Sequence, residues 1–299
     1  MKNWLKLSRP EFHTVAIFPL LMGAGLGHAA SAAFYLWPTL LALASVVAIM
    51  LATYWLGEVY DFEVDRLSAT LEKNKFSGGT LVLQEHKIPH RKVSMASLGA
   101  VVTALIIGLY LAWGAGYGPS LFLLGMAGAI MGIFYSTPPF QWAYKGIGEI
   151  MIAFAYGWFP VAAGYYLQTM QWDMEAIALY GLAPAVSIFL VIFINEFPDF
   201  PADRQFGKRN LVVRLGRERS AILYGLTGIL LAAYMVLLAF AGEKAFLYAL
   251  PAALLALWNA LDVLRGRWKE RKKLEEICGR TIALNLLISI LLSVGILLG

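Results

Sequence analysis

The stretch "WPTLLALASVVAIMLATYWLGEVY" at residues 37–60, followed by "DFEVDR" at 61–66, decides how this chain folds. Its first 20 residues carry no charge, and about 20 apolar residues in a helix cross the hydrocarbon core of a bilayer. Four carboxylates then follow between Glu58 and Asp65. Because an unpaired charge at membrane depth is costly, these acids need a partner or a function.

The composition places the whole chain in the membrane. Of the 299 residues, 60% are hydrophobic and 14% are charged, whereas a soluble domain carries roughly 25% charged residues. The single cysteine, Cys278, excludes an intramolecular disulfide and argues against a cysteine-ligated metal cluster. We expect an all-α, polytopic protein, with one domain over residues 1–299 and nine transmembrane helices. The nine apolar segments are 14–32, 37–60, 94–114, 118–135, 147–168, 176–200, 219–241, 245–264 and 281–298.

The basic residues predict the orientation of these helices. Short loops rich in Lys and Arg stay on the cytoplasmic side, and 23 of the 24 Lys and Arg residues lie in alternate connections, leaving only Lys244 on the other side. This distribution predicts a cytoplasmic N-terminus and an external C-terminus in the plasma or inner membrane. The net charge of +5 is then a topology signal, and nucleic-acid binding is not expected.

An acidic motif occurs twice. Residues 58–66 read "EVYDFEVDR" and residues 196–204 read "EFPDFPADR", which share the pattern E-x-x-D-F-x-x-D-R. Each copy ends an apolar segment, and the charge distribution puts both ends at the cytoplasmic surface. We therefore expect two acidic clusters at one face of the membrane.

Helical spacing indicates which acids act together. At about 100° per residue, the first, fourth and eighth positions of each motif fall within roughly 60° of one another. Glu63 points about 140° away from Glu58, and the repeat replaces it with Pro201, so we expect Glu63 to be solvated or paired. The acids expected to bind a metal are Glu58, Asp61, Asp65, Glu196, Asp199 and Asp203.

Two prolines complicate the second motif. Pro198 and Pro201 cannot donate a backbone hydrogen bond, so a helix through 196–203 is expected to be kinked or to have ended already. Non-helical backbone at membrane depth is tolerated where it lines a cavity. The prolines therefore predict a broken helix beside a site.

Clustered carboxylates without His or Cys favour a hard cation such as Mg²⁺. Because Mg²⁺ loses its water reluctantly, it is bound by a few carboxylates together with phosphate oxygens of a substrate. The two clusters therefore predict a diphosphate bridged by metal ions. For either cluster alone, salt bridges with Arg66 or Arg204 are the alternative.

The connecting loops carry the positive charge that a diphosphate requires. After Asp65, a basic stretch precedes Gly78 and Gly79, whose backbone N–H groups can approach phosphate. The basic and polar candidates for phosphate binding are Lys73, Asn74, Lys75, Lys145, Lys208 and Arg209. Lys75 and Lys145 are preferred because each lies beside a turn marked by glycine or proline.

With these motifs, the chain resembles the UbiA-type intramembrane aromatic prenyltransferases over essentially its whole length. "LSRP" at 7–10, "NKFSGG" at 74–79, "FYSTPPFQWAYKGIGE" at 134–149, "GYYLQT" at 164–169 and "DRQFGKRNLVVRLG" at 203–216 look most like the menaquinone branch, which prenylates 1,4-dihydroxy-2-naphthoate. The chain departs from the family where the first motif usually opens with Asn-Asp and this sequence has Gly57-Glu58.

The resemblance implies a chemistry and roles for these residues. Mg²⁺ held by the aspartates of both motifs would bind a polyprenyl diphosphate, and Lys75 and Lys145 would share that role. The aromatic interior would shield an allylic cation from water, with Tyr135 of the "YSTPP" element as a catalytic residue. Arg9 is a candidate for the carboxylate of the acceptor. The aromatic residues considered are Tyr54, Tyr60, Phe134, Tyr135, Tyr156 and Phe193.

Two classes of alternative stay open at this point. Within the enzyme class, the acceptor can be 4-hydroxybenzoate, homogentisate, haem or a glycerophosphate ether lipid. Outside that class, acids in membrane helices often mark a transporter, although transporter sites lie near the bilayer midplane rather than at helix ends. The sequence predicts neither the prenyl chain length nor the oligomeric state.

Overall fold

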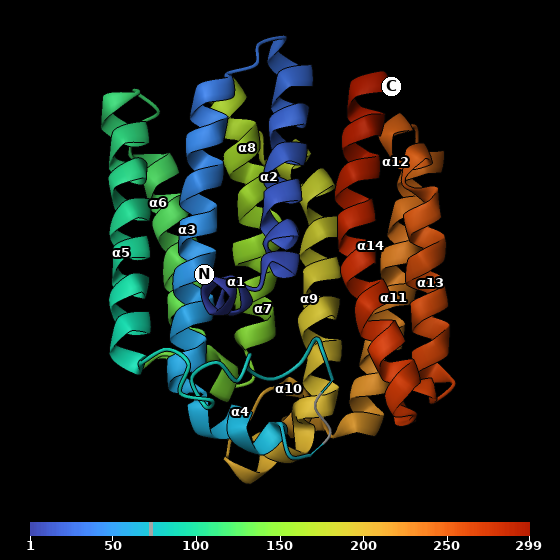
Figure 1. Ribbon diagram of the computed structural model, residues 1–299. Coiled ribbons are helices and arrows are strands. Elements are labelled where there is room, and N and C mark those ends of the chain that lie inside the picture. The colour runs from blue at the N-terminus through green and yellow to red at the C-terminus, as the bar shows by residue number, and fades with distance from the viewer. Residues whose placement is uncertain (72–73) are drawn as a thin grey trace.

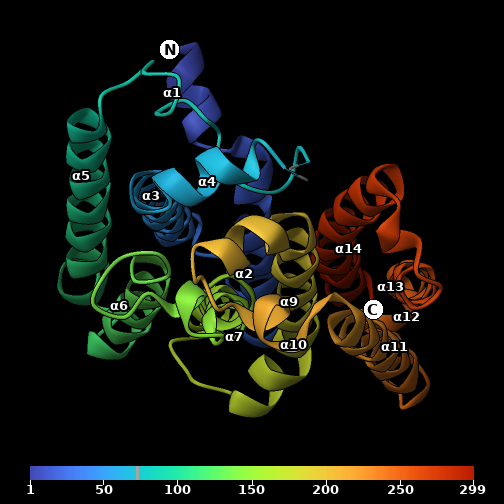
Figure 2. The ribbon, with the colours of Figure 1, turned by 90° about the horizontal axis from the view of Figure 1, so that it is seen from below.

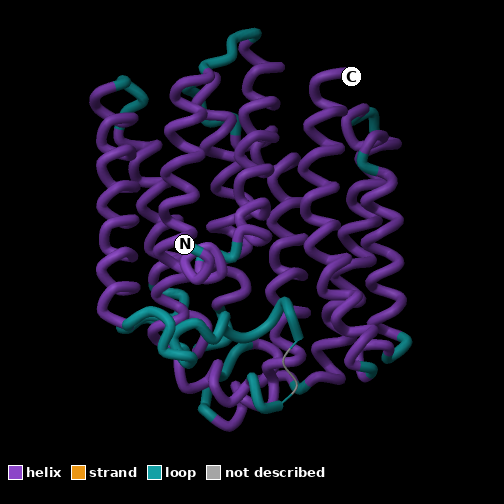
Figure 3. Tube along the Cα trace, viewed as in Figure 1, coloured by secondary structure: helices purple, strands orange, loops and turns teal. Residues whose placement is uncertain are grey.

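In this computed structural model, which describes residues 1–71 and 74–299, every regular element of the described residues is a helix (Figure 3). The α-helices are α1 (Lys2–Leu7), α2 (Pro10–Ser31), α3 (Leu36–Tyr60), α4 (Phe62–Ser68), α5 (His90–Leu109), α6 (Pro119–Ile133), α7 (Gly148–Ile152), α8 (Phe159–Thr169), α9 (Met174–Gln205), α10 (Leu211–Leu215), α11 (Arg217–Phe240), α12 (Lys244–Tyr248), α13 (Leu250–Leu264) and α14 (Arg271–Leu298). Short π-helical segments at Tyr110–Gly114 and Ala153–Trp158 extend α5 and join α7 to α8.

The long helices run side by side as a bundle (Figure 1). Seen from below, α3, α5 and α6 lie on one side, α11, α13 and α14 lie on the other, and α2 and α9 lie between them (Figure 2). Within the described residues, seven helical stretches are long and apolar enough to cross a membrane, and α6 and α13 are shorter apolar helices of 15 residues each. This is the multi-pass, all-α fold expected, while the count of nine crossings and the orientation of the termini stay predictions.

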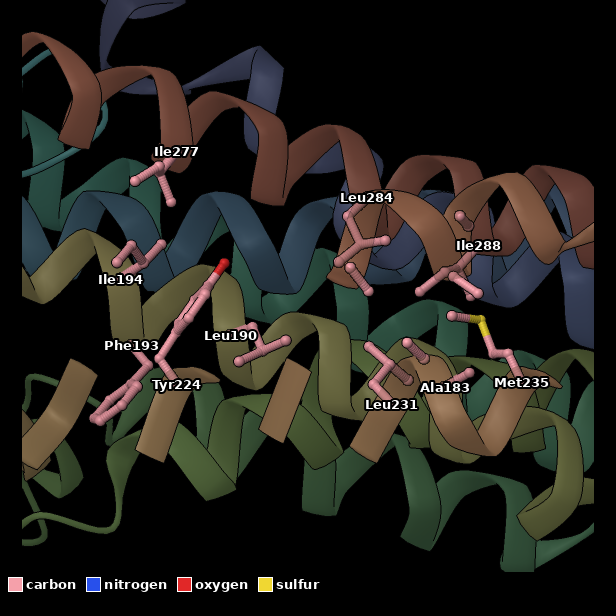
Figure 4. Close-up of a cluster of buried hydrophobic side chains, with 14 of the residues drawn as sticks. Ala183, Leu190, Phe193, Ile194, Tyr224, Leu231, Met235, Ile277, Leu284 and Ile288 are labelled. Atoms are coloured by element: carbon pink, nitrogen blue, oxygen red, sulfur yellow. The ribbon is translucent and has the colours of Figure 1, made fainter. Parts of the chain in front are cut away.

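The largest buried cluster joins α9 to the C-terminal helices. Leu190, Phe193 and Ile194 of α9 lie beside side chains of α11 and α14 (Figure 4). The partners labelled there are Tyr224, Leu231, Met235, Ile277, Leu284 and Ile288. Because lipid tails are as apolar as leucine, close packing rather than burial from water holds such helices together. This packing fixes α9, which carries the second acidic motif.

Glycines set the close approach of α2 and α8. A Cβ at Gly23 of α2 would lie 2.1 Å from the carbonyl oxygen of Val161, and one at Gly164 of α8 would lie 2.2 Å from that of Leu20. Small residues let membrane helices approach until their backbones touch. The α2–α8 pair is therefore packed backbone against backbone.

The predicted end of the helix at the second motif is wrong. Helix α9 continues through Pro198 and Pro201 to Gln205. Proline at 198 removes the donor for the carbonyl of Ile194, and the Sγ of Cys278 on α14 lies 3.8 Å from that oxygen as a replacement donor. A neighbouring helix thus satisfies the freed group, which is how membrane helices tolerate proline.

The chain changes direction at the first motif instead. Helix α3 ends at Tyr60 and α4 begins at Phe62, with Asp61 between them at φ −91° and ψ 12°. The N–H of Asp61 still donates to Gly57, and the N–H of Asp65 still donates to Asp61, each at 2.8 Å. Because this i to i−4 bonding persists across the junction, the acids of the first motif keep a common direction.

The close approach of α2 and α8 yields a test with a matched control in one helix. Gly23→Ala should lower the melting temperature in detergent by about 3 °C or more, because overpacking costs about 1 to 3 kcal/mol. Gly25→Ala should leave it unchanged or raised, since nothing lies within 4 Å of a Cβ there and alanine is the better helix former. Equal melting temperatures for the two variants would contradict the packing described.

Candidate active site

Both acidic motifs line one cavity at the end of the bundle where α4, α10 and the loop before α5 gather (Figure 1). The first motif reaches it from α3 and α4, and the second reaches it from the last three turns of α9. Arg9 and Lys208 are the basic side chains that line it in the described part of the chain. The acids in its wall are Glu58, Asp61, Asp65, Glu196, Asp199 and Asp203. The sequence repeat therefore corresponds to two halves of a single polar site.

Each aspartate of the first motif is held from a different direction. Asp61 accepts hydrogen bonds from the Oγ of Ser136 at 2.8 Å and from the hydroxyl of Tyr144 at 2.7 Å. Asp65 lies against Gly79, where a Cβ would come within 2.1 Å of its Oδ2. Burial, together with the charges of Asp61 and Glu58, raises the pKa of Asp65 well above its usual range.

The second motif is held by the loops. Asp199 accepts hydrogen bonds from the Oγ of Ser68 at 2.5 Å and from the backbone N–H of Gly78 at 2.7 Å. Asp203 accepts one from the Nδ2 of Asn210 at 2.7 Å. Donors from α4, from the loop before α5 and from the start of α10 thus orient the acids of α9 toward the first motif.

Lys208 joins the two motifs directly. Its Nζ lies 3.4 Å from Oδ2 of Asp61 and 4.0 Å from Oδ1 of Asp203. Burial alone would lower the pKa of Lys208, but the charges of Asp61 and Asp203 outweigh it and raise that pKa well above its usual range. The Lys208 amine therefore stands between two carboxylates from opposite halves of the site.

Glu58, which opens the first motif, is bound by protein donors. Its Oε1 accepts from the Nη2 of Arg9 and from the N–H of Thr80, each at 2.8 Å, and its Oε2 accepts from the Oγ1 of Thr80 at 2.8 Å. The same Nη2 of Arg9 donates to the carbonyl of Gly78 at 2.9 Å. Glu58 thus anchors the loop, and whether it also binds a metal stays a prediction.

Several residues predicted to bind phosphate lie outside the cavity. Lys75 and Lys145 are exposed, with Lys75 over the ring of Phe76 and Lys145 near the carbonyl of Pro139. Arg209 is also exposed. Lys73 lies outside the described residues.

Two of the predicted residues support the loop or face the cavity. Asn74 is buried and accepts from the N–H of Phe76, so it shapes the turn before the glycines.

Tyr135 lines the cavity, as do Tyr54 and Tyr156 among the aromatic candidates. Tyr60 is exposed instead, and Phe193 belongs to the α9 core. Phe134 lines a separate apolar cavity between α3, α5, α6 and α8.

Glu63 lies outside the cavity, as predicted. Half of its side chain is exposed, and it pairs with Arg66 at 2.6 Å. The angular argument therefore separated the acids of the cavity from the bystander.

Sequence reasoning missed the side chains that orient the acids of the two motifs. They are Ser68, Thr80, Ser136, Tyr144 and Asn210. A local signal existed for Asn210, whose Oδ1 caps α10 by accepting from the N–H of Val213 three residues on. The others come from distant segments, so no local pattern marks them.

The donor set fits a hard cation bound together with a diphosphate. Its six acids line one wall and offer oxygen ligands alone. Within residues 1–71 and 74–299, no three acidic side chains are already grouped closely enough to hold a metal ion by themselves. Such a site is completed by phosphate oxygens of the substrate, as Mg²⁺ prefers.

Comparison with known proteins bears on this geometry. The profile of the UbiA prenyltransferase family matches residues 16–287. The 1,4-dihydroxy-2-naphthoate octaprenyltransferase of Haemophilus influenzae is 26% identical over 100% of this chain and 97% of its own length. The enzyme of the same name from Bacillus subtilis is 27% identical over 73% of this chain and 67% of its own length.

The fold is shared with a solved structure. A UbiA homologue from Archaeoglobus fulgidus, determined bound to GPP and Mg²⁺, superposes with a TM-score of 0.63 at 17% identity and covers 96% of this chain and 99% of its own. The family profile extends over most of the chain, including both acidic motifs. This chain therefore belongs to the UbiA prenyltransferase family.

Proposed function

We propose that this protein transfers a polyprenyl group from a polyprenyl diphosphate to 1,4-dihydroxy-2-naphthoate, with Mg²⁺, in the plasma or inner membrane and from a site facing the cytoplasm. The observation that carries the proposal is the single cavity in which two acidic motifs face each other across Lys208. The named naphthoate enzymes among the relatives support the choice of acceptor.

The aspartates and Lys208 divide the work at the diphosphate. Asp61, Asp65, Asp199 and Asp203 would hold Mg²⁺, which when bound neutralises charge on the leaving diphosphate. The hydrogen bonds from Ser136, Gly78 and Asn210 keep three of these carboxylates aimed into the cavity. The ammonium of Lys208, already charged and buried between the motifs, stabilises the negative charge that grows as the allylic C–O bond breaks.

The inner part of the cavity suits the cationic fragment. Tyr54, Tyr135 and Tyr156 stand in its wall together with aliphatic side chains of α9 such as Ile188 and Val191. Aromatic ring faces stabilise a cation, and apolar walls keep water from capturing it. Tyr156 also lines the apolar cavity between α3, α5, α6 and α8, which would take part of the prenyl tail.

Arg9 is placed to receive an anionic acceptor. One of its terminal nitrogens is committed to Glu58 and Gly78, while its Nε is buried and unpaired among the residues that the structure describes. A carboxylate on the acceptor would complete its hydrogen bonding. This arrangement favours an aromatic acid such as dihydroxynaphthoate over a neutral ring.

The direct test is an acceptor panel. Purified protein in detergent, with Mg²⁺ and geranylgeranyl diphosphate, is offered dihydroxynaphthoate, 4-hydroxybenzoate and homogentisate, and products are detected by mass. Prenylated dihydroxynaphthoate is expected as the main product, with none when Mg²⁺ is chelated. Product from another acceptor alone would overturn the choice of substrate while keeping the reaction class.

The facing acids can be separated from the bystander by mutation. Asp61→Ala and Asp199→Ala should each lower kcat by about 100-fold or more, because each removes a group that binds the charged headgroup. Glu63→Ala should stay within about threefold of wild type, since Glu63 pairs with Arg66 outside the cavity. A comparable loss from Glu63→Ala would contradict the assignment of faces.

Lys208, which lines the cavity, and Lys145, which lies outside it, make a second paired test. Lys208→Ala should lower kcat by about 100-fold, because it removes a buried charge that faces the reacting headgroup. Lys145→Ala should have a much smaller effect, because Lys145 is exposed outside the cavity. The role for Lys145 that the family resemblance implies requires instead a loss as large as that at Lys208, so steady-state kinetics of both variants decide between them.

A further inference from the structure

A second polar pocket lies on the outside of the bundle, away from the acidic motifs. It is formed by Lys75 and Phe76 of the loop before α5, by Trp258 of α13, and by the first turns of α14. The pocket is open to the surroundings and has a volume of about 810 Å³. That is ample for the glycerophosphate headgroup of a lipid.

Basic side chains predominate in this pocket. They are Lys75, Arg271, Lys272 and Arg280, against the two acids Glu275 and Glu276. Glu276 is paired with Lys273 at 2.9 Å, so it offers little repulsion to an anion. Arg280 is likewise paired, with Asp262, and Lys75, Arg271 and Lys272 against Glu275 still leave the pocket a net positive charge.

Arg280 lines the pocket and is held in place by two neighbouring side chains. Its Nη2 binds Asp262 at 2.6 Å and its guanidinium stacks over Trp258 at 4.2 Å from the ring centre. Its Nε is buried without a hydrogen-bond partner in the described ranges. Because a buried donor without a partner is costly, an anionic oxygen here would be favourable.

The position of the pocket matches the rim of a membrane. Trp258 is 54% exposed, and one turn deeper on the same face of α13 Leu254 is 69% exposed. A tryptophan at such a boundary marks the level of lipid headgroups, with apolar side chains below it facing acyl chains. A ligand in the pocket can thus keep its charge among the basic residues and its tails against α13.

The pocket also adjoins the active-site loop. Phe76 lines both this pocket and the acidic cavity, and two residues later Gly78 donates to Asp199. The preceding Asn74 lies 3.7 Å from the Sγ of Cys278 on α14. A ligand in the outer pocket would therefore contact Phe76, which belongs to the loop that orients the second motif.

We propose that this rim pocket binds the phosphate of an anionic phospholipid of the surrounding leaflet, and that the bound headgroup supports the loop at 74–80. The shared chemistry is a lipid phosphate, which the prenyl diphosphate donor also carries. An anionic phospholipid is the occupant favoured here because the pocket opens beside lipid-facing α13 and its acids leave a modest net charge, whereas a diphosphate with Mg²⁺ finds its carboxylates in the other cavity.

The test counts bound lipids on the intact protein by native mass spectrometry. Lys272→Glu reverses one charge in the pocket. Arg265→Glu is the matched control, because Arg265 is exposed at the C-terminal end of α13 and does not line the pocket. The wild-type protein and Arg265→Glu should each bind phosphatidylglycerol more tightly than phosphatidylcholine. Phosphatidylglycerol should bind Lys272→Glu about 30-fold more weakly, as expected for a change of two charges near an anionic headgroup.

Two outcomes would overturn the proposal. The first is equal binding of phosphatidylglycerol to Lys272→Glu and Arg265→Glu, provided that both melt at the same temperature without lipid. The second is that geranyl diphosphate displaces phosphatidylglycerol from the wild-type protein and that Lys272→Glu weakens the binding of geranyl diphosphate. That result would assign the pocket to the prenyl donor. Retained binding when inorganic phosphate is added in excess supports recognition of the whole lipid.

Discussion

The bridge from Lys208 to Asp61 and Asp203 is the interaction on which the site depends. Six acidic side chains line one cavity between apolar helices, where charges repel one another more strongly than in water. A buried ammonium between the two motifs offsets part of that repulsion and leaves room for further positive charge. The cavity is thus electrostatically incomplete in a way that suits a ligand arriving with its own cations.

This balance requires the loops as much as the bundle. The donors to Asp199 come from Ser68 and Gly78, and the donor to Asp203 comes from Asn210, all outside α9 itself. The packing of α9 against α11 and α14 places the acids (Figure 4), but the loops determine their direction. A site of this kind forms only after segments far apart in sequence have met at one end of the bundle.

What the sequence predicted follows from what repeats or alternates in it. The apolar segments, the all-α fold and the repeated motif are periodic signals, and the stray Glu63 was identified because one helix face cannot hold it. The sequence favoured Lys145 over Lys208 because Lys145 lies beside a glycine turn, whereas in the fold Lys208 lines the cavity and Lys145 is exposed; both stand in basic loops, and only the fold decides which one turns inward. The prolines misled for a similar reason. The donor lost at Pro198 is replaced by Cys278, which lies 84 positions along the chain from its acceptor, Ile194.

The two backbone polar groups of Gly78 explain why two glycines follow the polar turn. The N–H of Gly78 donates to Asp199 while its carbonyl accepts from Arg9, which in turn binds Glu58. Gly78 has φ of 63°, where a side chain is strained, and a Cβ at Gly79 would strike Asp65. The glycines therefore let the backbone pass between the motifs and connect them through Gly78. Lys208 connects them a second time through its ammonium group. Two chemically independent links, one ionic and one through the backbone, thus join the two halves of the repeat, so that carboxylates from both motifs face one cavity.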